Sequence, residues 1–217
     1  KLPFIRATSL GHEVLHNWWG NGVYPDYAAG NWAEGLTTYM ADYYYKERES
    51  AAAARDMRAG WLRDFAAVAQ ESRQPLASFR SRLHGAAAAV GYGKAAMVFH
   101  MLRGEVGDAA FEQALRAFWE RHRFRTASWD DLRAAFEAAA GRNLGDFFTQ
   151  WLHRSGAPQL DLRDATARQA DGRTTLQVTV EQNHCITGSH SHAAREGALR
   201  AEVAGVMDGD DMVVAGR

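Results

Sequence analysis

The residues best suited to chemistry in this chain are two histidines spaced four apart, His12 and His16, with Glu13 between them. On an α-helix such a pair shares one face, with Cβ atoms roughly 5–6 Å apart, so both imidazoles can reach one metal ion. Zinc accepts imidazole nitrogen readily, and a catalytic zinc site uses three protein ligands and keeps one position for water. The Glu13 carboxylate can then accept a proton from that water as it attacks a carbonyl carbon. The interpretation without a metal is a pair of solvent-facing histidines on an amphipathic helix.

A candidate for the third ligand is Glu34, early in the next predicted helix. We expect this helix to turn the Glu34 carboxylate back toward His12 and His16, where it would complete an anionic zinc site. An acid in the first turn also interacts favourably with the helix dipole, so the position of Glu34 alone does not identify a ligand.

Two segments together resemble a known family. The pattern His-Glu-x-x-His-x-Trp-x-Gly-Asn at residues 12–21 and Trp-x-Glu-Gly at residues 32–35 is similar to the alanyl aminopeptidase family of zinc peptidases, which are gluzincins related to the leukotriene hydrolases. The resemblance implies that His12, His16 and Glu34 hold one Zn²⁺ per chain and that Glu13 is the general base.

The spacing departs from the family at one point. His16 and Glu34 are separated by 17 residues, one fewer than is usual in the family. We expect the loop Val23–Asn31 to absorb this deletion without moving the helix that carries Glu34.

A later segment extends the resemblance. Residues Gly91–Met97 are similar to the family's Tyr-x-Lys-(Gly or Ala) segment. This similarity implies that the Tyr92 hydroxyl donates a hydrogen bond to the oxyanion that develops in the transition state. Tyr24 and Tyr27, in the loop between the ligands, are the alternatives for this role.

The fold predicted from the pattern is mainly α, from Arg6 to about Ser155. Apolar side chains repeat at helical spacing in Ala95–Leu102, Phe111–Trp119 and Leu144–Leu152, and these stripes should form the core. The resemblance covers roughly residues 1–180 and implies the helical lobe of a thermolysin-like zinc peptidase domain, with a short C-terminal β segment.

The sequence predicts three parts. Residues 1–157 form the helical zinc-peptidase domain, without its upstream portion. Residues 158–183 alternate apolar and polar side chains around Asp171-Gly172, which predicts a β-hairpin that begins a following β domain. Residues 184–217 are expected to be irregular or loosely ordered. That tail carries four side chains of metal-binding types, His184, Cys185, His190 and His192. Their spacing matches no closed structural site, so we interpret this segment as a flexible polar tail.

Composition narrows the classes of partner. The 217 residues are 47% hydrophobic with a formal net charge of −1, which fits a globular protein and supplies no field that attracts nucleic acid. No run approaches the roughly 18–20 apolar residues of a membrane span. The single cysteine, Cys185, cannot form an internal disulfide and assigns no compartment, so localisation stays open.

The resemblance implies a peptide substrate and release of N-terminal amino acids. The family's Gly-x-Met-Glu-Asn segment, whose glutamate binds the substrate's free amino group, does not occur in the sequence. We therefore expect a piece of a longer enzyme with flanking domains, weak or inactive by itself. An endopeptidase with the same zinc core, a non-catalytic helical zinc-binding module and the hydrolysis of an epoxide lipid are the alternatives. Glu13 argues against a purely structural zinc site, because such a site has no use for a general base.

Overall fold

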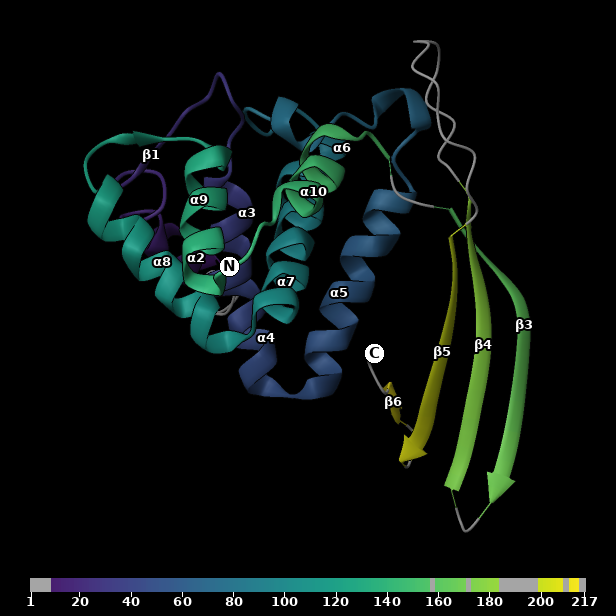
Figure 1. Cartoon of the computed structure of the whole chain (residues 1–217). Helices are drawn as coiled ribbons and strands as arrows, with labels where there is room; N and C mark the ends of the chain where they lie inside the picture. The colour runs from purple at the N-terminus through teal and green to yellow at the C-terminus, as the bar shows by residue number, and fades with distance from the viewer. Residues whose placement is uncertain (1–8, 157–158, 171–172, 184–198, 209–210, 215–217) are drawn as a thin grey trace. The chain divides into compact units, whose positions relative to one another are not determined.

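Two compact units make up the chain, Lys1–Ser155 and Gly156–Arg217. The computed structural model describes residues 9–156, 159–170, 173–183, 199–208 and 211–214. The first unit is built of helices and the second of antiparallel strands (Figure 1). The mainly α fold predicted from the sequence, with a C-terminal β segment, is confirmed. The assignment of the second unit to a following domain stays a prediction.

The helical unit begins with α2 (Ser9–Leu15), which carries His12 and is followed directly by His16. The next long helix is continuous but changes its winding, from α3 (Ala33–Thr37) through the π-helical segment η1 (Thr38–Tyr43) to α4 (Tyr44–Glu49). The remaining helices are α5 (Ala51–Ala66), α6 (Gly85–Ala88), η4 (Ala89–Lys94), α7 (Ala95–Val106), α8 (Asp108–His122), α9 (Trp129–Ala140), α10 (Gly145–Phe148) and η5 (Thr149–His153).

The connections between helices include short regular pieces. Two 3₁₀ turns, η2 (Gln70–Ser72) and η3 (Leu76–Ser78), follow α5. The strands β1 (Tyr24–Pro25) and β2 (Thr126–Ala127) pair in parallel and tie the loop after α2 to the start of α9. The helix α2 ends at Leu15 and not at Gly20, where the glycine predicts a helix end, and α5 ends at Ala66 although its helical composition continues to Glu71.

Local sequence explains where several helices begin. Ser50 accepts a hydrogen bond from the backbone of Ala53 at 3.0 Å and starts α5. Ser128 and Asp131 bond each other's backbone N–H groups in the capping box predicted for α9. That helix ends at Gly141, whose φ of 66° gives the left-handed cap that glycine adopts without strain.

The core of the helical unit consists of the predicted apolar stripes. In α7, Ala95, Val98, Phe99 and Leu102 are fully buried, and α7 packs against α3 and α8. Each large apolar side chain buried in this way contributes about 1.5–3 kcal/mol to folding. The metal-site helices therefore rest on an interior that packing holds in one arrangement.

The second unit is an antiparallel sheet in the order β3-β4-β5-β6 (Figure 1). Strands β3 (Gln159–Ala170) and β4 (Arg173–Asn183) form the predicted hairpin, with a bulge between Leu162 and Asp164. The turn Asp171-Gly172 lies outside the described residues.

The structure differs from the sequence-based expectation beyond residue 184. Instead of an irregular tail it has β5 (Leu199–Asp208), paired with β4, and β6 (Asp211–Val214), paired with β5. The alternation of apolar and polar residues is blurred in β5 because Ala204 and Val206 occupy alternate positions where polar residues would mark a strand. The His184, Cys185, His190 and His192 cluster lies outside the described residues.

Within the described part of the chain, every helix is too short or too polar to cross a membrane.

Candidate metal centre

The two histidines meet as the sequence predicts. His12 is buried on α2, and the backbone N–H of His16 still donates to the His12 carbonyl at 3.2 Å, so the helical spacing continues past the end of α2. The two rings lie edge to face, with centroids 4.8 Å apart and an interplanar angle of 80°. Their Nε2 atoms are separated by 3.1 Å.

A tight turn after α2 fixes the second ring. The Nδ1–H of His16 donates to the Trp19 carbonyl at 2.8 Å. The next residue, Gly20, has a φ of 125°, and a Cβ there would lie 3.3 Å from His16 Nδ1. Glycine is the residue that adopts this φ without strain, and its missing side chain leaves room for the imidazole.

Three contacts bring Glu34 to the histidines. The Asn31 side chain accepts from the backbone of Ala33 at 3.0 Å and so caps the helix that carries Glu34. The buried Trp32 indole donates to the Ala127 carbonyl at 2.7 Å. Gly35 allows close packing against α7, because a Cβ at this position would lie 2.2 Å from the Cβ of Ala95. The loop that is one residue shorter than usual thus still delivers Glu34 to the site.

Three potential ligand atoms converge on one point. Glu34 Oε2 lies 3.3 Å from His12 Nε2 and 3.2 Å from His16 Nε2. A tetrahedral zinc site with bonds of about 2.05 Å has ligand atoms about 3.3 Å apart, so the set fits that ion. Among the described residues, this is the group of histidine, cysteine and acidic side chains able to hold a metal.

The protonation pattern also favours a cation. Each histidine uses its Nδ1–H for a bond outside the site, so each neutral ring would turn an Nε2 lone pair toward the other ring and toward the carboxylate. Three lone pairs at this distance repel each other unless a metal ion or protons lie between them. We infer that the residues present fit zinc.

The pKa values show how protons substitute for an ion. Burial lowers the pKa of His12, but hydrogen bonds to Asp42 and Glu34 outweigh it and raise that pKa to about 9. The hydrogen bond to Glu34 raises the pKa of His16. Burial raises the pKa of Glu34, but the bonds from both histidines outweigh it and lower that pKa to about 2. Metal binding must therefore displace protons from the imidazoles.

Asp42 contacts the candidate site, and the sequence reasoning missed it. Its Oδ2 accepts from His12 Nδ1 at 2.8 Å, which fixes the ring orientation and leaves Nε2 toward the metal position. In an unbroken α-helix, Asp42 would be about 80° around the axis from Glu34, since eight residues exceed two turns. The wider turn of η1, which contains Asp42, offsets this difference, so both carboxylates face α2. No simple residue pattern marks this change of winding, so the spacing of Asp42 alone does not indicate the contact.

The structure brings Tyr92 to the site. It lies in the π-helical segment η4, and its ring is stacked on that of His12, with centroids 6.1 Å apart and an interplanar angle of 14°. Its hydroxyl lies within electrostatic reach of the Glu34 carboxylate. Burial, followed by the charge of Glu34, raises the pKa of Tyr92. The hydroxyl therefore keeps its proton and remains a donor.

The alternatives for the donor role lie elsewhere. Tyr24 pairs with Thr126 in the β1–β2 ladder and is 43% exposed, and Tyr27 is 55% exposed. No hydrogen bond from either hydroxyl to the metal-site residues is present in the described part of the chain. Glu13 is exposed next to His12, and its charge is among the causes that raise the pKa of Tyr92. Glu13 and Tyr92 thus lie within electrostatic reach of each other.

Comparison with solved structures finds zinc metallopeptidases of similar fold. The chain matches an M1 zinc metallopeptidase from Deinococcus radiodurans, an E323A mutant bound to a Tyr-Ser-Ala substrate, with a TM-score of 0.54 and 26% identity over 69% of this chain and 33% of that chain. A two-domain M1 zinc metallopeptidase, an E323A mutant bound to L-tryptophan, gives a TM-score of 0.57 and 27% identity over 69% of this chain and 33% of that chain.

Comparison with curated sequences finds aminopeptidases among the relatives. Aminopeptidase M1 of Arabidopsis thaliana is 26% identical over 176 residues, which cover 79% of this chain and 20% of the relative. Aminopeptidase N of Escherichia coli (strain K12) is 28% identical over 159 residues, which cover 71% and 18%. The chain thus spans about a fifth of the length of these relatives. The model of the peptidase family M1 domain matches residues 6–151, and the chain belongs to that family.

Proposed function

We propose that this chain forms the zinc-binding and catalytic core of a peptidase that releases N-terminal amino acids from peptides. One Zn²⁺ would be held by His12 Nε2, His16 Nε2 and the Glu34 carboxylate. The observation that carries the proposal is that these three atoms lie 3.1–3.3 Å from one another. The Nδ1 atoms of both rings are already hydrogen-bonded, to Asp42 and to the Trp19 carbonyl. Three ligands leave the open fourth position that a catalytic zinc site uses.

The side chains around this position divide the chemistry between them. Zinc, when bound, supplies a Lewis acid that lowers the pKa of water and polarises a carbonyl group. Glu13 takes a proton from the attacking water and delivers it to the departing amine. Tyr92 donates a hydrogen bond to the carbonyl oxygen as that oxygen gains negative charge. Asp42 keeps the His12 ring in the orientation that this arrangement needs.

A test of the mechanism is Glu13→Gln, which keeps the size of the side chain and removes the base. We expect zinc content by metal analysis to stay at one ion per chain while peptide hydrolysis falls by about 10²- to 10⁴-fold. The matched control is Glu120→Gln, the same change at an exposed position on α8. Hydrolysis unchanged by Glu13→Gln, with zinc retained, would remove the proposed mechanism.

Specificity for chain ends needs its own test. The relatives are named aminopeptidases, which supports this choice, and the chain spans only about a fifth of their length. We expect a longer protein that contains this chain to cleave peptides with a free amino terminus and to spare N-acetylated ones, and the chain alone to be weak. Equal cleavage of both peptides would indicate an endopeptidase. Full activity of the chain alone would contradict the expectation that residues outside it bind the substrate amine.

A further inference from the structure

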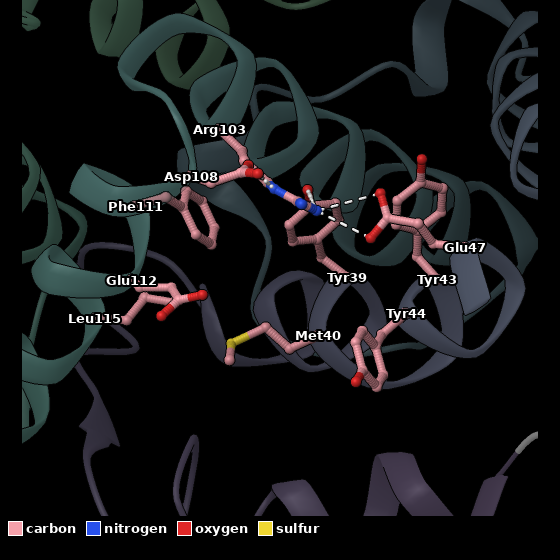
Figure 2. Close-up of a pocket in the computed structure, with 10 residues that line it drawn as sticks. All are labelled: Tyr39, Met40, Tyr43, Tyr44, Glu47, Arg103, Asp108, Phe111, Glu112 and Leu115. Carbon is pink, nitrogen blue, oxygen red and sulfur yellow. Dashed lines mark hydrogen bonds and ion pairs between the residues drawn. The ribbon is translucent and has the colours of Figure 1, made fainter. Parts of the chain in front are cut away.

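A pocket of about 330 Å³ lies between the helix η1–α4 and the first half of α8. Its lining comes from three helices, namely η1–α4, the end of α7 and the first half of α8 (Figure 2). The lining contains none of His12, His16, Glu34 or Tyr92. The lining residues are Tyr39, Met40, Tyr43, Tyr44, Glu47, Arg103, Asp108, Phe111, Glu112 and Leu115. The pocket is therefore separate from the metal centre, although both use the same helix.

The inner wall of the pocket is aromatic and rigid. Tyr39 and Tyr43 are 4% and 2% exposed and stack with ring centroids 5.3 Å apart. Phe111 packs edge-on against Tyr39 at 5.8 Å. Tyr44, by contrast, is 46% exposed, and the Arg48 guanidinium already lies over its ring, 5.7 Å from the centroid, and donates to its hydroxyl at 3.1 Å. Aromatic faces carry negative electrostatic potential and attract organic cations, provided the cation can lie over a ring.

The polar groups of the pocket are mainly acidic. The lining has three carboxylates, on Glu47, Asp108 and Glu112, against one guanidinium, on Arg103. Arg103 divides its donors between two of them: Nη1 lies 3.0 and 3.2 Å from the Glu47 oxygens, and Nε lies 2.6 Å from Asp108. One guanidinium cannot neutralise two carboxylates, so this cluster keeps a net negative charge.

Glu112 adds a third carboxylate, whose ion pair is exposed and weak. Figure 2 shows its carboxylate on the α8 side of the pocket near Met40, away from the Arg103–Glu47 pair. Its ion pair is with Arg116 at 3.6 Å, and both side chains are largely exposed, at 69% and 78%. Such a pair is worth little in water, so Glu112 can accept a new partner at small cost.

We propose that this pocket binds the side chain of an arginine or lysine from a peptide segment. The alkyl stem would lie against Met40 and Leu115, and the cationic head would meet Glu112. The volume falls within the range of small-ligand sites, and the charge and aromatic walls match a cation on an apolar stem.

The test compares two probes that differ in charge and little in shape, Nα-acetyl-arginine methylamide and its neutral citrulline analogue. The reporter is the ¹³C-labelled methyl group of Met40, assigned with a Met40→Leu variant. We expect the Met40 signal to shift as the arginine probe is added and to reach a plateau at saturation. The arginine probe should bind at least about fivefold more tightly than the citrulline probe, and added salt should weaken its binding.

Two glutamate variants test whether the arginine probe binds in this pocket. Glu112→Gln should weaken binding of the arginine probe about threefold, which is the range of an exposed ion pair. Glu120→Gln makes the same change farther along α8, outside the pocket, and should leave binding unchanged. Thermal unfolding of both variants checks that they fold alike. Equal binding of the citrulline probe, no saturable shift at Met40, or equal effects of the two glutamate variants would each overturn the proposal.

Discussion

One continuous helix, α3–η1–α4, contributes carboxylates to both the metal centre and the pocket that is lined by Tyr39, Tyr43 and Tyr44. At the metal centre, Glu34 and Asp42 are half-buried and each bonds an imidazole nitrogen. At the pocket, Glu47 is 37% exposed and its partner Arg103 is 32% exposed. Burial lowers the effective dielectric constant, so equal contacts are worth more at the first site than at the second. Single substitutions should therefore change binding strongly at the metal centre and only slightly at the pocket.

The largest effect is expected for Glu34→Ala, which removes a ligand and leaves two protonatable imidazoles facing a void. We expect the purified variant to lose its zinc on dialysis against a chelator that leaves the parent protein loaded. Glu47→Ala, on the same helix but at the pocket, should keep its zinc. A Glu34→Ala protein with undiminished zinc content would contradict the assigned ligand set.

Tyr92→Phe should have the next largest effect. The ring packing against His12 stays, but the hydroxyl donor is lost. The loss of one oxyanion donor lowers kcat by about 10²- to 10³-fold. Zinc content should not change, and the comparison is made in a protein with measurable activity. A kcat unaffected by the substitution would return Tyr24 and Tyr27 to consideration.

Asp42→Asn should weaken zinc without abolishing it. Removing a carboxylate behind a metal-bound imidazole typically costs 10- to 100-fold in affinity. Competition with a chromophoric chelator measures the loss, and Asp56→Asn, an exposed change on α5, is the matched control. An affinity equal to that of the control would show that the Asp42–His12 contact does not support the metal site.

The last prediction concerns the free energy of unfolding of the metal-free protein as the pH changes. The pKa of His12 is about 9 in the folded state, above its ordinary value of 6.5. Its contribution to stability is therefore complete below about pH 6.5 and is lost as the pH rises through 9, by about 3 kcal/mol. Denaturant unfolding in chelator at pH 6.5 and 9 should show this fall, and the zinc-loaded protein should not. A metal-free protein that gains stability over this range would contradict the protonated arrangement.

The sequence allowed prediction of the parts of the site that depend on local spacing. The His12–His16 pair follows from helical geometry alone, and the capping box at Ser128 and the apolar stripe of α7 follow from their own residues. Glu34 and Tyr92 needed the resemblance, because long-range packing brings them together. Their roles stay proposals.

Other features could not be predicted because they arise only in three dimensions. Asp42 reaches His12 through a change of winding that no simple residue pattern marks. The pocket joins Glu47 to Arg103 across 56 residues of chain. Strand β5 was missed because apolar residues occupy both of its faces, which removes the alternation on which the prediction relies.

The π-helical segment Thr38–Tyr43 also limits which insertions and deletions this chain can accept. It behaves like an α-helix that has gained one residue, so a deletion within it could restore regular winding and rotate the following residues by about 100° relative to Glu34. That single event would turn Asp42 away from His12 and shift Glu47 relative to Arg103. Length changes in this helix should therefore disturb both sites at once, whereas the loop Val23–Asn31 can change length while Glu34 stays in place.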